Sequence, residues 1–224
     1  MRFPTKSYTI GGYDVSYITV TRSETRDIGI LGSERCAIST FANDVESDDV
    51  VWDVGANVGM YSTLAGVIGA ETHAFEIIEE NAMRVAENAA TNGAEDTVTT
   101  HEIGLFDENG TTTVRTGDVT TGYSVASLSG DGERTVETKR GEDVEAPSPT
   151  VMKIDTEGAE KPILDGMGDR LDDIRVLYIE VHETKKCKEF GYTRRELLDQ
   201  LDELGFDATP VEKHGSDIMR ATRQ

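Results

Sequence analysis

Residues 51–62 have the sequence VWDVGANVGMYS, and this segment gives the strongest indication of the fold class. Its apolar start predicts a buried strand over 50–54, and the apolar spacing after it predicts a helix over 58–68. Gly55 and Gly59 lie in the turn between them, where glycine lets the backbone pass close to a ligand. The free N–H groups at the start of the helix point into the same space. The segment therefore predicts a strand, a ligand-binding turn and a helix.

The glycine spacing of this turn argues against a dinucleotide site. The fingerprint G-x-G-x-x-G, counted from Gly55, requires glycines at positions 57 and 60, which are Asn57 and Met60 here. Pyrophosphate approaches less closely past those side chains. An NAD-linked oxidoreductase on the same sheet remains an alternative, as does a noncatalytic nucleotide-binding module.

Beyond this turn the chain alternates between strand and helix patterns. Such alternation favours a parallel sheet with helices on both faces, and ligands bind beyond the carboxyl ends of its strands. The segment 105–145 is rich in Thr, Gly and Asp and predicts an antiparallel β insertion. We expect residues 1–47 to form an N-terminal appendage and residues 48–224 the main domain. The predicted elements are a hairpin over 7–20, helices over 33–46, 79–91 and about 160–166, strands over 71–76, about 97–103, 150–154 and 175–181, a capped helix after Thr193 and Glu196, and late strands near 206–211 and 217–221.

The composition of the chain argues against several classes of protein. The chain of 224 residues has 22 Lys and Arg against 43 Asp and Glu, a net charge of −21. That charge argues against nonspecific binding of nucleic acid and against attraction to anionic lipid. The acids are spread along the chain, so we expect adaptation to high salt. Two cysteines predict neither a disulfide framework nor a zinc site, and no apolar run is long enough for a membrane span or a signal peptide. We expect a cytoplasmic protein.

Three further segments carry acidic or basic side chains at predicted strand ends. They are AFE at 74–76, KIDTEGAE at 153–160 and IEVH at 179–182. Together with DVGANVGMYS, they make the chain similar to the FkbM family of methyltransferases from about residue 48 to 185. This resemblance implies a class I methyltransferase fold with a mostly parallel seven-stranded sheet. It also implies S-adenosylmethionine as cofactor and methylation of hydroxyl groups, often on sugars or secondary metabolites.

The resemblance implies roles along the cofactor. The turn after the first strand would hold the methionine end, Glu76 would hold the ribose, and the end of the third strand would border the adenine. A carboxylate at the position of Glu76 can accept hydrogen bonds from both ribose hydroxyls. Ser127 lies in a Ser-Leu pair like that of the family, although a Ser- and Thr-rich loop explains it equally. The predicted cofactor residues are Asp53, Gly55, Ala56, Asn57, Gly59, Tyr61, Glu76, Ile77, Glu102 and Ile103.

The candidate catalytic residues follow the fourth and fifth strands. Asp155 and Glu157 come after one strand, and Glu180 and His182, which share a face of extended chain, come at the end of the next. An alcohol must lose its proton during or after methyl transfer, so a general base is expected within reach of it. We expect His182 or Asp155 to be the base and Glu157 to orient the acceptor.

Each candidate also has a purely structural explanation, as a helix cap or as an ion-pair partner of Lys153, Lys161 or Lys185. Two carboxylates and one imidazole are reasonable ligands for a divalent cation. No third carboxylate is fixed by the motif, however, so we expect no metal.

The other histidines, His73, His101 and His214, are expected to be structural. The acceptor, a glycan or another small molecule, is predicted to bind the segment 105–145 and the termini. Its identity stays open, as do N-methylation and the oligomeric state.

Overall fold

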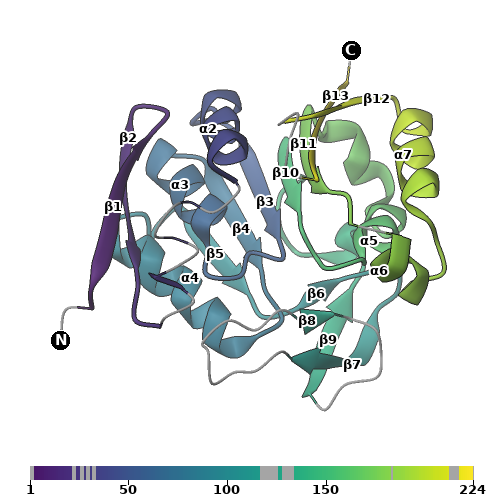
Figure 1. The fold of residues 1–224 in the computed structure, drawn as a ribbon, viewed down its shortest axis with the longest axis horizontal. Coiled ribbons are helices and arrows are strands. Elements are labelled where there is room, and N and C mark those ends of the chain that lie inside the picture. The colour runs from purple at the N-terminus through teal and green to yellow at the C-terminus, as the bar shows by residue number, and fades with distance from the viewer. Residues whose placement is uncertain are drawn as a thin grey trace.

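The computed structural model describes residues 3–21, 24–25, 28, 31, 34–116, 126–127, 134–182, 184–211 and 217–223. A seven-stranded sheet runs through the molecule in the order β12-β13-β11-β10-β3-β4-β5 (Figure 1). Strand β13 is antiparallel to both neighbours, and all the other pairs are parallel. The prediction of a mostly parallel seven-stranded sheet is therefore confirmed. Its strands are β3 (Val50–Val54), β4 (Glu71–Phe75), β5 (Val98–His101), β10 (Val151–Ile154), β11 (Val176–Glu180), β12 (Phe206–Pro210) and β13 (Ile218–Arg223).

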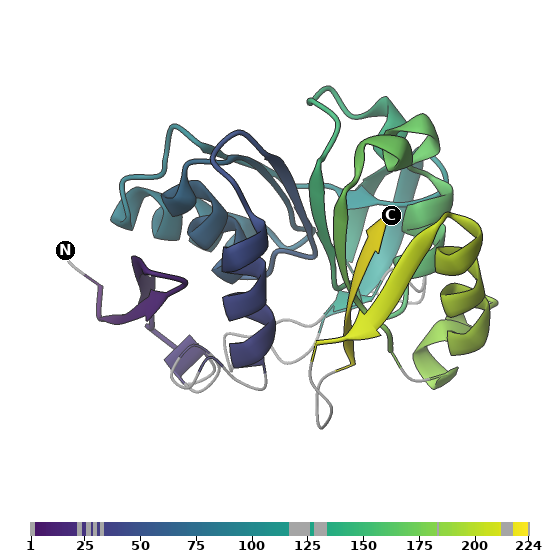
Figure 2. The same ribbon diagram turned by 90° about the horizontal axis from the view of Figure 1, so that it is seen from above.

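Helices cover both faces of this sheet (Figure 2). One face packs on α2 (Arg35–Asp44), α3 (Met60–Ile68) and α4 (Glu79–Thr91). The other face packs on α5 (Glu160–Asp165), α6 (Thr184–Glu189) and α7 (Arg194–Glu203). The central strands are buried on both sides, as parallel strands between two helical layers must be. Helix α6 was not predicted, whereas the capping box of Thr193 and Glu196 at the start of α7 is confirmed.

The insertion forms a second sheet of four strands in the order β6-β9-β7-β8. Strand β7 pairs antiparallel with β8 and β9, as the sequence predicts, but β6 pairs parallel with β9. Val114 and Val136 of this sheet pack into the core on the α5 side of the large sheet. A 3-10 turn, Gly141–Asp143, follows β9, and a second, Gly168–Asp173, precedes β11. The strands are β6 (Gly104–Leu105), β7 (Gly110–Thr116), β8 (Ala126–Ser127) and β9 (Arg134–Lys139).

The N-terminal hairpin consists of β1 (Thr5–Ile10) and β2 (Tyr13–Ile18), joined at two glycines with positive φ. It packs against α3 and α4 through polar contacts. The backbone N–H of Ile18 donates to Oδ1 of Asn88 at 2.8 Å, and the Tyr17 hydroxyl donates to the carbonyl of Met60 at 2.8 Å. Because Met60 begins α3, the hairpin supports the helix that follows the ligand-binding turn. The boundary at residue 47 stays a prediction.

None of the helices within the described ranges combines the length and the apolar character that crossing a bilayer requires.

Two of the remaining histidines, of which His73 is buried and His101 half-buried, form a chain of contacts on β4 and β5. Nδ1 of His73 lies 3.0 Å from Nε2 of His101, and Nε2 of His73 lies 3.2 Å from the carboxylate of Glu71. The His101 ring stacks on Phe75 with ring centroids 4.7 Å apart. These contacts support structural roles for His73 and His101, whereas His214 lies outside the described residues.

The acid stability of the fold should depend on His101. Burial, with smaller effects of His73 and Lys139, lowers the pKa of His101 to about 4. Between pH 6.5 and pH 4 the unfolded chain therefore binds a proton that the folded chain does not, and stability falls as the pH falls. We expect this histidine to account for about 1–2 kcal/mol of the loss, less than a fully buried group because His101 is partly exposed.

Urea unfolding of His101→Gln and the parent between pH 7 and pH 4 measures this effect. The carboxylates titrate in both proteins and cancel in the difference. Parallel pH profiles for the two proteins would contradict the assignment.

Candidate active site

The turn between β3 and α3 has a backbone that requires glycine. Gly55, Asn57 and Gly59 have φ of 76°, 52° and 78°. A Cβ on Gly55 would lie 1.9 Å from the carbonyl oxygen of Asp155, a backbone atom that cannot swing away. The turn therefore runs directly against the end of β10. This contact places the turn beside the predicted catalytic residues.

Asp53 anchors the start of α3. Its side chain is fully buried, and Oδ2 accepts hydrogen bonds from the backbone N–H of Ser62 at 3.0 Å and from the Ser62 hydroxyl. Its Oδ1 lies 3.7 Å from Nζ of Lys153 and accepts no hydrogen bond from the part of the chain that the structure describes. These contacts match the role of orienting the turn, and its role toward a cofactor stays a prediction.

Glu76 holds the tip of the turn. It is 6% exposed; Oε2 accepts from the backbone N–H of Asn57 at 2.7 Å, and Oε1 accepts from that of Ile78 at 2.8 Å. Burial raises the pKa of Glu76 to about 7 against the opposing effect of these hydrogen bonds. Glu76 lies directly after β4, where the sequence predicts the ribose to bind.

The turn fits the amino-acid end of S-adenosylmethionine. Oδ1 of Asn57 is buried and has no hydrogen-bond partner among the described residues, and such atoms in native proteins are commonly satisfied by a ligand or water. The missing side chain at Gly55 lets the turn pack directly on the carbonyl group of Asp155. Gly55, Asn57 and Glu76 would hold the cofactor here. Of the other predicted cofactor residues, Ala56 and Tyr61 are buried beside the turn, Ile77 and Ile103 are partly buried, and Glu102 is exposed.

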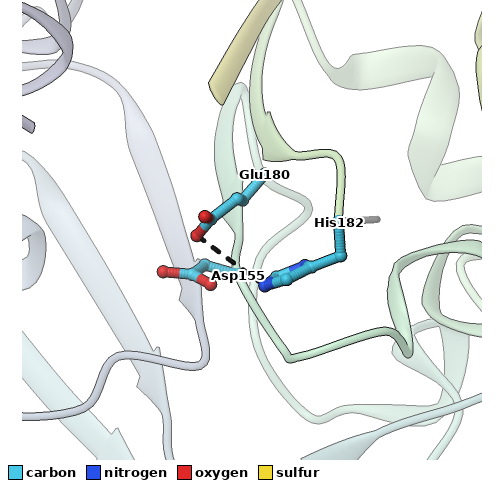
Figure 3. Close-up of side chains that lie close together, drawn as sticks. All are labelled: Asp155, Glu180 and His182. Atoms are coloured by element: carbon cyan, nitrogen blue, oxygen red, sulfur yellow. Dashed lines mark ion pairs between the residues drawn. The ribbon is translucent and has the colours of Figure 1, made fainter. Parts of the chain in front are cut away.

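A second group of side chains meets at the ends of β10 and β11. These strands are parallel neighbours, so Asp155, which follows β10, lies close to Glu180, the last residue of β11, and to His182. Figure 3 shows the three side chains pointing toward one another. One ligand atom from each lies within 4.8 Å of the other two. The structure thus brings together Asp155, His182 and Glu180, the acid that the sequence places on the same strand face as His182.

Lys153 is a buried cation within this group. Its Nζ lies 3.4 Å from Oδ2 of Asp155, 3.7 Å from Oδ1 of Asp53, and 4.9 Å from the ring centroid of Tyr61. Burial alone would lower the pKa of Lys153, but Asp155, Asp53 and Glu34 together raise it. Burial acts to raise the pKa of Asp155, whereas Lys153 holds it below its usual value. Lys153 thereby connects the cofactor turn to the candidate catalytic residues.

His182 is fixed by Glu160, which is fully buried. Nδ1 of His182 donates to Oε1 of Glu160 at 3.0 Å, and the Tyr192 hydroxyl donates to Oε2 at 2.9 Å. Nε2 of His182 then faces Glu157 at 3.4 Å and Glu180 at 4.0 Å. Burial would lower the pKa of His182, but Glu160 and the neighbouring carboxylates raise it to about 9. Burial, and to a smaller extent the negative charge of Asp155, raises the pKa of Glu180 to about 8.

Glu157 stands at the rim of this group. Its φ is 59°, an uncommon value for a residue with a side chain, and its carboxylate pairs with Lys186 of α6. The side chain of Glu157 is 23% exposed, so it faces both the cluster and solvent. The three predicted catalytic residues therefore lie together, and their roles stay predictions.

Sequence reasoning missed Glu160, Tyr192, Lys153 as a site residue, and Glu34. Glu160 is the last residue of KIDTEGAE and the first of α5, where an acid is expected simply to favour the helix N-terminus. A glutamate there that is fully buried is the signal of a second role, and burial was not available from the sequence. Glu34 precedes α2, in a segment that matched no motif.

Comparison with solved structures shows the same fold elsewhere. The crystal structure of Methyltransferase FkbM from Methylobacillus flagellatus KT matches with a TM-score of 0.52 and 14% identity, over 92% of this chain and 56% of that one. This chain thus spans just over half the length of that protein. A putative rRNA-methylase from Clostridium thermocellum matches with a TM-score of 0.51 and 9% identity, over 83% and 92% of the two chains. At these identities the likeness concerns the fold alone.

Sequence comparison identifies a curated relative and a family. The relative is the hexuronic acid methyltransferase AglP of Haloferax volcanii, which is 28% identical over 177 residues, 77% of this chain and 72% of the relative. The model of the Methyltransferase FkbM domain matches residues 53–208, which include the turn, the cluster and Glu160. The chain belongs to the FkbM family of methyltransferases, and its methyl donor is S-adenosylmethionine.

Proposed function

We propose that the chain transfers the methyl group of S-adenosylmethionine to a hydroxyl group of an acidic sugar. The observation that carries the proposal is the close packing of the turn at Gly55 on Asp155, which supports a position for proton-accepting groups next to the predicted methyl donor. The name of the Haloferax volcanii relative, a hexuronic acid methyltransferase, supports an acidic sugar as acceptor.

Helix α6 supports an acidic acceptor independently. Lys185, Lys186 and Lys188 lie in this helix, although the chain carries a net charge of −21. Lys186 contacts Glu157 at the rim of the cluster. Local positive charge beside the site would attract a sugar carboxylate that the rest of the surface repels.

Different residues would bind the cofactor, accept the proton and orient the acceptor. The cofactor, when bound, supplies a methyl group activated by its positively charged sulfur. Gly55, Asn57 and Glu76 hold it, and the chain must align the acceptor oxygen with the methyl carbon, because orientation alone lowers the barrier by several kcal/mol. Asp155 and, in its neutral form, His182 are the groups placed to accept the hydroxyl proton, and Glu157 orients the acceptor.

Two substitutions test the catalytic roles. We expect Asp155→Asn and His182→Ala each to lower kcat by about 10²–10⁴-fold, the usual contribution of a positioned general base. The affinity for S-adenosylhomocysteine, measured by calorimetry, should change little because neither side chain belongs to the turn. Normal turnover in either variant would remove that residue from the mechanism.

The acceptor class is tested with a glucuronic acid glycoside and the matching glucoside. We expect methyl transfer to the first and much weaker transfer to the second. Equal transfer to both would overturn the acidic sugar. The noncatalytic alternative predicts a different pair of results. The chain would bind S-adenosylhomocysteine, but the glycans of a strain that lacks the gene would keep every methyl group.

A further inference from the structure

We propose that Asp155, Glu180 and His182 form a binding site for a divalent cation of the Mn²⁺ or Mg²⁺ type, which holds the acceptor hydroxyl. The proposal rests on the methyl transfer proposed above and adds a metal to it. The sequence predicts no metal, because its motif fixes no third carboxylate beside two carboxylates and one imidazole. The tertiary structure places Glu180 together with Asp155 and His182.

The geometry of the three side chains suits one cation. They offer two carboxylate oxygens and one imidazole nitrogen, all within 4.8 Å of one another, and they point toward a common space (Figure 3). Ligand bonds to Mg²⁺ are about 2.1 Å long, so its ligands lie at most about 4.2 Å apart. Adjacent ligands of such an ion lie about 3.0 Å apart, so side-chain movements of up to about 1 Å would bring the three atoms around one cation. Carboxylates with one imidazole fall among the ligands of Mn²⁺ and Mg²⁺.

The buried Glu160 is an independent sign of a metal ligand. It engages Nδ1 of His182 and leaves Nε2 directed at the carboxylates. Metal-binding histidines commonly donate their other ring N–H to a carboxylate, which fixes the ring and its tautomer. Tyr192 and the backbone N–H of Gly158 in turn hold Glu160 in place. The site therefore has both its ligands and the support behind them.

Charge within the cluster is unbalanced without a cation. Lys153 lies between Asp53 and Asp155, Lys186 pairs with Glu157, and Glu160 engages His182. Glu180 lies 4.0 Å from His182 and makes a side-chain hydrogen bond to Asp155, a contact in which a proton, or a cation in its place, must lie between the two carboxyl groups. Carboxylates gathered in a partly buried site repel one another unless a counter-charge lies among them. A divalent cation between Asp155 and Glu180 supplies that charge.

The cation would change how the proton is removed. Coordination makes the acceptor hydroxyl more acidic, so Asp155 and His182 act as ligands and the proton passes to Glu157, which is partly exposed and releases it to water. The acceptor oxygen then forms its bond to the methyl carbon while the carbon–sulfur bond breaks, which leaves S-adenosylhomocysteine and the methyl ether. A sugar acceptor has a second oxygen next to the reacting hydroxyl group, and this oxygen could serve as a further ligand of the cation.

Electron paramagnetic resonance with Mn²⁺ tests the site. In buffer with molar KCl, which screens weak binding to the acidic surface, we expect one tightly bound Mn²⁺ per chain. Its spin-echo spectrum should show coupling to an imidazole nitrogen that His182→Ala removes. Glu180→Gln and Asp155→Asn should each weaken binding by at least about 30-fold. The matched control is Glu203→Gln, because Glu203 is an exposed carboxylate on α7; this variant should bind as the parent does.

Three results would overturn the cation site. They are Mn²⁺ binding that is equal in Glu180→Gln and Glu203→Gln, a spectrum without nitrogen coupling, and full methyl transfer after exhaustive chelation. Calorimetry of the chelated chain with S-adenosylhomocysteine separates this proposal from the function on which it rests. Mn²⁺ bound with nitrogen coupling but no S-adenosylhomocysteine binding would sustain the cation site and overturn the proposed function.

Discussion

Gly55→Ala should abolish binding of S-adenosylhomocysteine, lowering its affinity by more than about 100-fold. The new methyl group would lie 1.9 Å from the carbonyl oxygen of Asp155, and φ at this position is 76°. The positive φ alone costs a residue with a side chain about 1–3 kcal/mol. The clash with a backbone atom forces the turn away from β10, so the space for the cofactor and its distance from Asp155 both change.

Gly93→Ala is the matched control for this change. Gly93 also has a positive φ, 69°, but a Cβ there meets no atom within 4 Å. We expect Gly93→Ala to lower the free energy of unfolding, measured in urea, by about 1–3 kcal/mol, which is the cost of a side chain at positive φ. Calorimetry should show that this variant binds S-adenosylhomocysteine as the parent does. Parent-like affinity in a folded Gly55→Ala chain would refute the assignment of this turn to the cofactor.

Glu160→Gln should lower kcat by about 10–100-fold while leaving the affinity for S-adenosylhomocysteine within about threefold. Glu160 accepts hydrogen bonds from Gly158, Tyr192 and His182 on its two oxygens. An amide has one oxygen and two N–H donors, so at least one of these donors would face another donor. The imidazole of His182 then loses its fixed orientation toward Asp155 and Glu180.

Urea unfolding and steady-state kinetics together check this prediction. We expect a loss of about 1–3 kcal/mol, the cost of leaving a buried donor unpaired. Tyr192→Phe removes one donor without creating a new one, so it should cost about 1 kcal/mol and lower kcat less than Glu160→Gln does. Equal kcat in Glu160→Gln and the parent would show that Glu160 stabilises the fold and does not position His182.

Elements with a strong local signal were predicted well. Helix α4 spans Glu79–Thr91, as its apolar spacing predicts, and the capping box of α7 is present. The turn at Gly55 and the strand before it also lie where VWDVGANVGMYS places them. In each case the residues that cause the structure lie within a few positions of one another, so the pattern is visible along the chain.

Elements that depend on distant partners were not predicted. Helix α6 has six residues and too little periodicity to be visible, and β6 pairs with β9 across the intervening insertion. Glu160 and His182 are 22 positions apart and touch only because β10 and β11 are neighbours in the sheet.

By itself, then, the sequence determined the alternation of strands and helices, the glycine turn and the family resemblance, because local spacing and side-chain chemistry encode them. Only the tertiary structure decided which charges meet. Glu180 joins Asp155 and His182, Lys153 links Asp155 to Asp53, and Glu160 turns the histidine toward them. The physical reason is that strand order and burial bring these groups together, and both are properties of the whole fold.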